Sequence, residues 1–298
     1  MLDILFDFLN KRNVYYEKNF DIKKISSIKI GGRASAIIYP KAQNELISVV
    51  DFLVDNNISY KTIGRMTNIL PSDENINTVL LSTAKFNHTD TNGFSVTCES
   101  GAILAQVLIK LARSGLGGAE ALISIPGSVG GMLYSNAGAY GSEISDFVKR
   151  VSIYDISSKQ VIFLTKDDLQ FGYRTSKLKI MNCIVLNAEF KLFKMNTEEI
   201  FERMKHFKEQ RRQKQPLGYP SLGSIFKKCN EYSAGELIDR CGLKGKRIGG
   251  AMISEKHAGF IINYHDATAD DVKALINLAE DSVLLKFGIR LEKEIEYL

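Results

Sequence analysis

Three kinds of polar side chain stand in short motifs that suit the chemistry of an anionic substrate. Arg174 lies in the segment FGYRTS, where a guanidinium can form a bidentate pair with a carboxylate or a phosphate. Ser224 lies in GSIFK, where a hydroxyl beside a glycine on a strand can donate a proton into a cleft. Glu292, Glu294 and Glu296 alternate in the tail and are predicted to share one strand face. Taken singly, each motif is also explained by a surface turn, a structural serine or a solvated acidic face.

Two glycine-containing segments are candidates for holding a phosphate-bearing ligand. Residues 64–73, GRMTNILPSD, follow a predicted strand with a tight turn that can aim backbone N–H groups at a phosphate. Residues 115–141 hold eight of the chain's 23 glycines, interrupted by large apolar residues. This composition predicts an ordered loop with short helical turns that a ligand can approach closely. Neither segment has the spacing of a P-loop or of a dinucleotide fingerprint.

Short apolar runs that alternate with amphipathic stretches predict a mixed α/β chain around these motifs. Helices are expected over residues 1–13, 43–54, 103–113, 198–213 with Thr197 as its N-cap, 234–240 and 269–287. Strands are expected over residues 36–39, 60–63, 79–81, 94–98, 151–154, 161–164, 183–192, 221–228, 258–263 and the tail. The strands between residues 151 and 192 are expected to form a second small sheet, and QPLGYP at 215–220 marks a domain boundary.

The composition is that of a globular protein with a mild basic excess. The chain has 298 residues, 45% hydrophobic and 24% charged, and a net charge of +5, which suits either nucleotide ligands or weak nucleic-acid binding. Four cysteines without CxxC spacing and four scattered histidines argue against a disulfide scaffold or a metal site. The first helix has no signal-peptide features, and no apolar run approaches the roughly 20 residues of a membrane span. We therefore expect a cytoplasmic protein.

In combination, the motifs closely resemble one family, the UDP-N-acetylenolpyruvoylglucosamine reductases (UDP-N-acetylmuramate dehydrogenases). The matching segments span roughly residues 26–295 in the order of that family: GRMTNIL, IPGSVGGMLYSNAGAYGSEI, FGYRTS, KQP with GSIFK, AGELIDRCGLKGKRIGGAMISEKHAGFIIN and FGIRLEKEI. ISSIKIGG at residues 25–32 resembles the family's entry into its flavin domain. The short path after residue 171 looks like the compact type II subgroup.

The resemblance implies an α+β protein in three parts. An N-terminal helix and lead-in cover residues 1–32, and a FAD-binding unit of the vanillyl-alcohol-oxidase type (PCMH-like), with two α/β subdomains, covers residues 33–214. A C-terminal α+β domain for the substrate covers residues 215–298. The resemblance also implies non-covalent FAD, NADPH as reductant, and reduction of UDP-N-acetylglucosamine enolpyruvate to UDP-N-acetylmuramate for peptidoglycan. A monomer is expected, with no nucleic-acid or membrane partner.

The same resemblance assigns binding positions. FAD is expected along the two glycine-containing segments, with the first turn at its pyrophosphate. The matching cofactor positions are Gly64, Asn68, Ile125, Pro126, Gly127, Ser128, Gly130, Gly131, Asn136, Gly138 and Ala139. The matching substrate positions are Tyr173, Arg174 and Lys214. A basic residue among Arg211, Arg212 and Lys214 is expected to neutralise the phosphates of UDP or NADPH, with a solvated helix face as the alternative.

Catalytic roles follow from the reaction that the resemblance implies. Hydride addition at C3 of the enolpyruvyl group leaves an enolate, which Arg174 would stabilise. Ser224 would protonate C2, and a carboxyl group near the substrate carboxylate would assist. We prefer Glu294 to Glu292 for that carboxyl group. His257 in SEKHAGF is a further candidate acid or base, with a hydrogen-bonded structural histidine as the preferred interpretation.

Three departures from the family pattern concern four positions, and two rival functions stay open. Met66 stands where the first loop usually has glycine, Lys228 and Cys229 follow the serine motif, and Gly259 stands where asparagine is usual. Met66 puts a side chain where the backbone needs φ > 0 or room for phosphate, which questions FAD affinity. The rivals are a flavin-less relative that binds a nucleotide sugar and a flavoprotein oxidoreductase with another substrate.

Overall fold

The computed structural model describes residues 2–229 and 231–298, and the chain divides into two compact units. The first unit contains Met1–Asn19, Ser35–Arg65 and Asn77–Glu209. The second contains Phe20–Ala34, Met66–Ile76 and Gln210–Leu298. Both units are therefore assembled from segments that are distant in sequence, and the loop of residues 64–68 contributes to both. In the part of the chain that the structure describes, no helix is long and apolar enough to cross a membrane.

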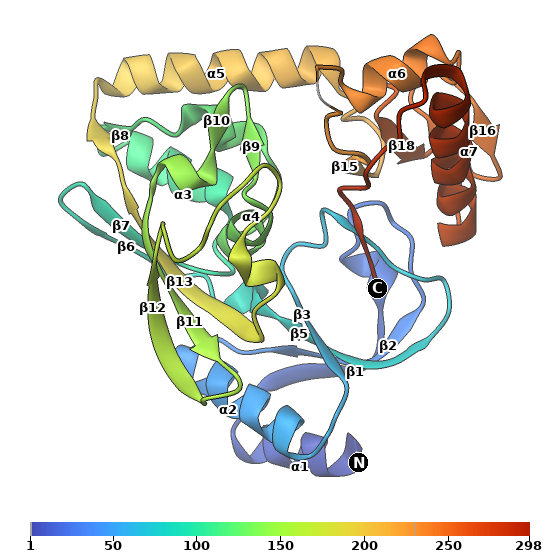
Figure 1. The fold of residues 1–298 in the computed structure, drawn as a ribbon. Coiled ribbons are helices and arrows are strands. Elements are labelled where there is room, and N and C mark those ends of the chain that lie inside the picture. The colour runs from blue at the N-terminus through green and yellow to red at the C-terminus, as the bar shows by residue number, and fades with distance from the viewer. Residues whose placement is uncertain (1, 230) are drawn as a thin grey trace. The chain divides into compact units, whose positions relative to one another are not determined.

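A four-stranded sheet with two helices forms the N-terminal part of the first unit. The strands lie in the order β1 (Tyr15–Asp21), β2 (Arg33–Tyr39), β5 (Ile76–Ser82) and β3 (Tyr60–Ile63), and β3 and β5 run parallel. Helices α1 (Leu2–Lys11) and α2 (Gln43–Asp55) lie side by side (Figure 1). The predicted helical face of α2 is confirmed, because its Leu46, Val49, Val50 and Leu53 are all buried.

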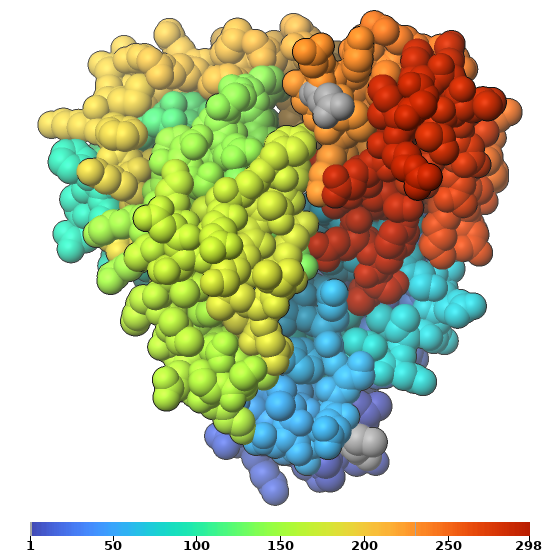
Figure 2. All heavy atoms as spheres, viewed as in Figure 1, coloured from blue at the N-terminus to red at the C-terminus, as the bar shows by residue number. Residues whose placement is uncertain are grey.

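A five-stranded antiparallel sheet forms the rest of the first unit. Its order is β12 (Gln160–Thr165), β11 (Val148–Asp155), β13 (Cys183–Lys191), β7 (Ser95–Glu99) and β6 (Thr89–Asn92). The second sheet expected from the strands between residues 151 and 192 is present, but it is larger than predicted. Strand β13 pairs with β11 on one edge and with β7 on the other, and Asn187 lies opposite both Ser152 and Glu99. In Figure 2, the side chains of residues 148–165, in lime, form a continuous surface on the face toward the viewer.

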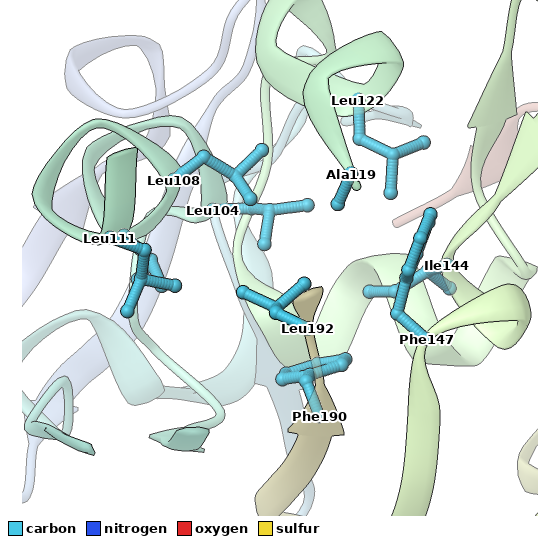
Figure 3. A pocket seen from close by; sticks show the side chains of 10 residues that line it. Leu104, Leu108, Leu111, Ala119, Leu122, Ile144, Phe147, Phe190 and Leu192 are labelled. Carbon is cyan, nitrogen blue, oxygen red and sulfur yellow. The ribbon is translucent and has the colours of Figure 1, made fainter. Parts of the chain in front are cut away.

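The glycine-rich stretch is ordered, as predicted, and consists of short elements. These are β8 (Leu116–Gly117), a 3-10 helix at Glu120–Ser124, α4 (Val129–Ser135), β9 (Gly138–Ala139) and β10 (Ser142–Glu143). Helix α3 (Leu104–Ala112) packs against the 3-10 helix, and β8 pairs with β14 (Phe193–Lys194). Apolar side chains alone line a cavity of about 20 Å³ between α3, the 3-10 helix and β13 (Figure 3). The stretch is therefore anchored on an apolar core.

Helix α5 (Thr197–Lys214) starts one residue earlier than predicted. The expected N-cap, Thr197, is wrong. Asn196 Oδ1 accepts hydrogen bonds from the backbone N–H groups of Glu198 at 2.8 Å and Glu199 at 3.3 Å. Asparagine is among the most effective N-cap residues, because its short side chain reaches these two donors.

The second unit contains its own four-stranded antiparallel sheet and two helices. The strand order is β15 (Ser221–Ser224), β18 (Phe260–Asn263), β17 (Ala251–Ile253) and β16 (Arg247–Ile248). Helices α6 (Ala234–Arg240) and α7 (Ala269–Phe287) have the predicted bounds, and their apolar faces join a separate buried core with the sheet.

Two strands of the second unit are shorter than predicted. The strand expected over 221–228 ends at Ser224. The tail forms a strand only at β19 (Glu296–Tyr297), which pairs in parallel with β4 (Ile69–Leu70). The expected face of three glutamates is therefore wrong, since a partner of two residues supports only a two-residue ladder.

Candidate active site

The two segments predicted to hold the cofactor pack directly against each other in the first unit. A Cβ atom added at Gly64 would lie 2.5 Å from Ser128 Oγ, and one at Gly130 would lie 2.9 Å from the Ser100 side chain. Ser128 in turn caps α4, its hydroxyl accepting from the Gly131 N–H. Glycine at these positions lets the backbone approach its neighbours closely, which suits a cofactor whose phosphates are held by backbone N–H groups.

The departure at Met66 proves to occupy a left-handed backbone position. Its φ is 53°, and its side chain is buried, whereas Arg65 before it is exposed. A non-glycine residue in this region costs about 1–2 kcal/mol. The first loop therefore keeps the backbone conformation for which glycine is the usual residue, with the methionine side chain buried.

Asn68 has a structural contact that the sequence did not indicate. Its Nδ2 donates to the carbonyl oxygen of Glu294 at 2.9 Å, and its own carbonyl accepts from the Glu296 N–H at 2.9 Å. The loop predicted to meet the cofactor thus fixes the backbone of the tail at the candidate catalytic carboxylate. In the sequence, the position of Asn68 in the loop was the one feature that drew attention to this residue.

Ser224 and Glu294 are brought together in the second unit by the backbone of Ile225. The Ile225 N–H donates to the Gly259 carbonyl at 2.9 Å, and its carbonyl accepts from the Glu294 N–H at 2.8 Å. A bulge between β15 and β18 precedes Ser224. The Ser224 hydroxyl donates to the Phe226 carbonyl at 3.1 Å. The hydroxyl and the carboxylate are therefore placed by main-chain bonds on neighbouring segments.

Glu292 and Glu294 have different surroundings. Glu292 forms an ion pair with Lys227, and its side chain is 70% exposed. The Lys227 N–H also donates to the Glu292 carbonyl at 2.8 Å. The Glu294 residue is only partly exposed. This difference favours Glu294 as the candidate catalytic group.

His257 lies beside the serine and explains the glycine at 259. A Cβ at Gly259 would lie 2.9 Å from His257 Cε1 and 3.4 Å from Ser224 Oγ. The Gly259 N–H donates to His257 Nδ1 at 3.1 Å. Burial lowers the pKa of His257, so the ring is neutral at pH 7 and can accept this bond. The contact agrees with the structural interpretation of His257 and shows why a larger side chain at 259 does not fit here.

Arg174 lies in the first unit, at the tip of a tight turn closed by Gly172 and Thr175. Its Nη2 donates to the Gly138 carbonyl at 2.8 Å, and its Cζ lies 5.0 Å from the ring centroid of Tyr173. Tyr173 itself is 49% exposed. The structure thus joins two predicted segments, the glycine-rich stretch and the arginine motif.

The remaining predicted residues lie at the surface or within the core of these segments. Lys214 is the last residue of α5 and its side chain is exposed, as a phosphate-binding group requires. Asn136 is buried, and its side chain bonds to protein groups rather than facing solvent. In residues 2–229 and 231–298, no group of three or more His, Cys, Asp or Glu side chains is arranged to hold a metal ion.

Comparison with known proteins assigns the chain to a family. Residues 215–298 match the family model described as "UDP-N-acetylenolpyruvoylglucosamine reductase, C-terminal domain", and residues 34–162 match "FAD binding domain". The UDP-N-acetylenolpyruvoylglucosamine reductase of Caldicellulosiruptor bescii is 42% identical over 98% of this chain and 93% of its own length. That of Thermosipho melanesiensis is 42% identical over 91% of each.

A solved structure agrees with this assignment. The reductase of the same name from Thermus caldophilus has a TM-score of 0.80 and 30% identity, covering 95% of this chain and 98% of that one. The FAD-binding domain that the resemblance implied is therefore confirmed over residues 34–162. On these identities over nearly the whole length, the chain belongs to the UDP-N-acetylenolpyruvoylglucosamine reductase family.

Proposed function

We propose that this protein reduces UDP-N-acetylglucosamine enolpyruvate to UDP-N-acetylmuramate with NADPH, as a cytoplasmic monomer, and that Arg174, Ser224 and Glu294 carry the reaction. The observation that carries the assignment of residues is the Ile225 backbone link, which sets Ser224 next to Glu294. Non-covalently bound FAD would supply the hydride chemistry that links NADPH to C3 of the enolpyruvyl group.

The backbone of the glycine-containing segments holds the cofactor. Gly64 and Asn68 would hold the pyrophosphate, and residues 125–131 with Gly138 and Ala139 would hold the rest of FAD. The contact of Gly64 with Ser128, where a Cβ would lie only 2.5 Å from the hydroxyl, supports this assignment because it leaves no room for a side chain at residue 64. The buried Asn136 supports these segments from inside the protein, through its hydrogen bonds to Glu143 and Gly172.

Arg174 stabilises the negative charge that develops on the substrate. A guanidinium fixed in advance costs no reorganisation when the enolate forms, which is the main benefit of preorganised electrostatics. The hydrogen bond to the Gly138 carbonyl supports this role, since it fixes one edge of the group. Tyr173, at the same turn, contacts the substrate with its half-exposed ring.

Ser224 supplies the proton to C2, and Glu294 assists at the substrate carboxylate. The Ser224 O–H points to the Phe226 carbonyl, so it must rotate about one bond to reach a substrate. The exposed ammonium of Lys214 neutralises the diphosphate.

Two half-reactions, measured anaerobically by flavin absorbance, test the assignment. Arg174→Ala and Ser224→Ala should retain flavin reduction by NADPH, while flavin oxidation by the enolpyruvyl substrate falls on the order of 10²–10⁴-fold. Ser221→Ala, on the same strand, is the matched control and should behave as wild type. Oxidation at wild-type rates in both active-site variants would refute the roles. Lys214→Ala should raise KM for the substrate with little change in kcat.

A further inference from the structure

The backbone of Arg174 adopts a conformation that arginine rarely takes. Reciprocal hydrogen bonds between Gly172 and Thr175, at 3.0 and 3.2 Å, close a turn whose two central residues are Tyr173 and Arg174. Arg174 has φ = 57°, the left-handed value that the second central position of a type II turn requires and that glycine usually fills. Strain of this kind persists only where the surroundings over-determine it. The surroundings of the turn are therefore informative.

The guanidinium of Arg174 contacts both strands of the β9–β10 hairpin, which is labelled in Figure 1. Nη2 donates to the Gly138 carbonyl on β9, and Nη1 lies 4.0 Å from Glu143 Oε1 on β10. The second distance is too long for a hydrogen bond, so Glu143 acts on the arginine mainly through its charge. The Arg174 side chain is 18% exposed, which leaves solvent little room to screen that charge.

One buried amide joins the turn to this carboxylate. Asn136 ends α4 with φ = 45° and is 1% exposed. Its Nδ2 donates to Glu143 Oε2 at 2.7 Å and to the Gly172 carbonyl at 2.9 Å. Its Oδ1 accepts from the Ser145 N–H at 3.3 Å. The same side chain therefore holds the base of the arginine turn and the carboxylate opposite the arginine head.

We infer that Asn136 and Glu143 are positioning residues for Arg174. Asn136 fixes the turn that carries the arginine, and Glu143 fixes the direction of its guanidinium, so that the group is set before the substrate arrives. This inference rests on the proposed role of Arg174 at the developing enolate. It also explains why the strained turn persists, since a turn without the left-handed residue would direct the Arg174 side chain elsewhere.

The chain offers two variants that separate the links. Glu143→Gln removes the charge beside the arginine but keeps an oxygen that can accept from Asn136. Asn136→Gly keeps the left-handed backbone and removes both side-chain links. Misplacement of a reacting group by about 1 Å can cost about 10²-fold in rate. We therefore expect substrate-dependent flavin oxidation to fall about 10-fold in Glu143→Gln and about 10²-fold in Asn136→Gly.

Four readouts distinguish positioning from a general structural role. Flavin reduction by NADPH, flavin content and Tm should stay near wild type in Glu143→Gln, and calorimetric binding of UDP-N-acetylmuramate should weaken. In an Arg174→Ala background, adding Glu143→Gln should lower the oxidation rate no further, because residues that act through one another are not additive. Glu199→Gln, which removes a carboxylate from a surface pair with Arg203, is the control and should match wild type.

The outcomes distinguish a failure of the proposed role of Arg174 from a failure of the inference about Asn136 and Glu143. Wild-type oxidation by Arg174→Ala would refute the proposed role of the arginine and, with it, this inference. A strong defect in Arg174→Ala with wild-type oxidation and product binding in Glu143→Gln would refute the inference alone. A Glu143→Gln defect that appears equally in both half-reactions, or that persists in the Arg174→Ala background, would also overturn it. If Asn136→Gly does not fold, Glu143→Gln still carries the test.

Discussion

The candidate catalytic groups of the two units are held in different ways. In the second unit, main-chain bonds place Ser224 and Glu294 through Ile225. In the first unit, Arg174 depends on side chains, because the amide of Asn136 holds both its turn and its acidic neighbour. Strand pairing is nearly independent of the side chains involved, whereas a turn with φ > 0 needs particular ones. Substitution of neighbours should therefore be felt around Arg174 and tolerated around Glu294.

The largest expected contrast lies between two glutamates of the tail. Glu294→Gln should lower the rate of flavin oxidation by the substrate by about 10²-fold, since it removes a candidate catalytic group. Glu292→Gln should change that rate less than about threefold and cost at most about 1 kcal/mol, because the Glu292 side chain of the pair is 70% exposed. Stopped-flow oxidation and urea unfolding measure both. A larger loss of oxidation rate in Glu292→Gln than in Glu294→Gln would contradict our choice of Glu294 as the catalytic carboxylate.

The contact between the cofactor segments should be sensitive to one methyl group. Gly64→Ala places a Cβ 2.5 Å from Ser128 Oγ, so we expect weaker FAD binding and a loss of about 1–3 kcal/mol in stability. In Gly64→Ala/Ser128→Ala the nearest atom of residue 128 would be its Cβ, 3.7 Å away, an ordinary contact. The double variant should regain FAD affinity, apart from about 1 kcal/mol for the lost helix cap. FAD titration that shows no defect in Gly64→Ala would contradict the packing argument.

An ion-pair cluster far from the site shows what side-chain linkage contributes to stability. Hydrogen bonds from Lys149 and Ser95 and the charge of Arg150 lower the pKa of Glu189 to about 2, from an ordinary value of 4.5. Because the folded pKa is the lower one, this stabilisation is present above pH 4.5 and is lost as the pH falls toward 2.

Removing the Glu189 carboxylate should therefore lower the free energy of unfolding by an amount that depends on pH. Glu189→Gln should lower the free energy of unfolding at pH 7 by about 1–2 kcal/mol, a value reduced for screening because both cations are more than half exposed. The difference from wild type should shrink as the pH is lowered from 7 toward 3. Urea unfolding across this range measures it, and a constant difference would contradict the assigned pKa.

The smallest expected effect concerns the start of α5. Asn196→Ala should cost about 1 kcal/mol, since it removes the acceptor for two N–H groups. Thr197→Ala should cost only a few tenths of a kcal/mol. Thermal unfolding of the pair distinguishes them, and an equal or larger loss in Thr197→Ala would restore threonine as the cap.

The sequence predicted the local elements better than their partners. Apolar periodicity located α2, α6 and α7, because each buries one face on its own core. It did not predict that β13 joins two sets of strands, since pairing is decided by residues far apart in the chain. Nor did alternation in the tail predict a strand of two residues, because that length is set by β4.

The candidate site shows the same limit. Motifs identified Arg174, Ser224 and Glu294 as chemical groups, and nothing in them indicated the left-handed turn at Arg174. The role of Asn136 was equally hidden, since its two partners lie 7 and 36 residues away. Only the folded arrangement separates groups that contact a ligand from those that hold them.

A visible spectrum recorded anaerobically on the purified protein tests the account most directly. We predict a flavin band that NADPH bleaches and that UDP-N-acetylglucosamine enolpyruvate then restores, which identifies cofactor, donor and acceptor in one sample. A colourless protein that FAD cannot reconstitute would contradict the account and favour a flavin-less relative that binds a nucleotide sugar. A band that NADPH bleaches but the substrate does not restore would contradict it too, and would point to a flavoprotein with another substrate.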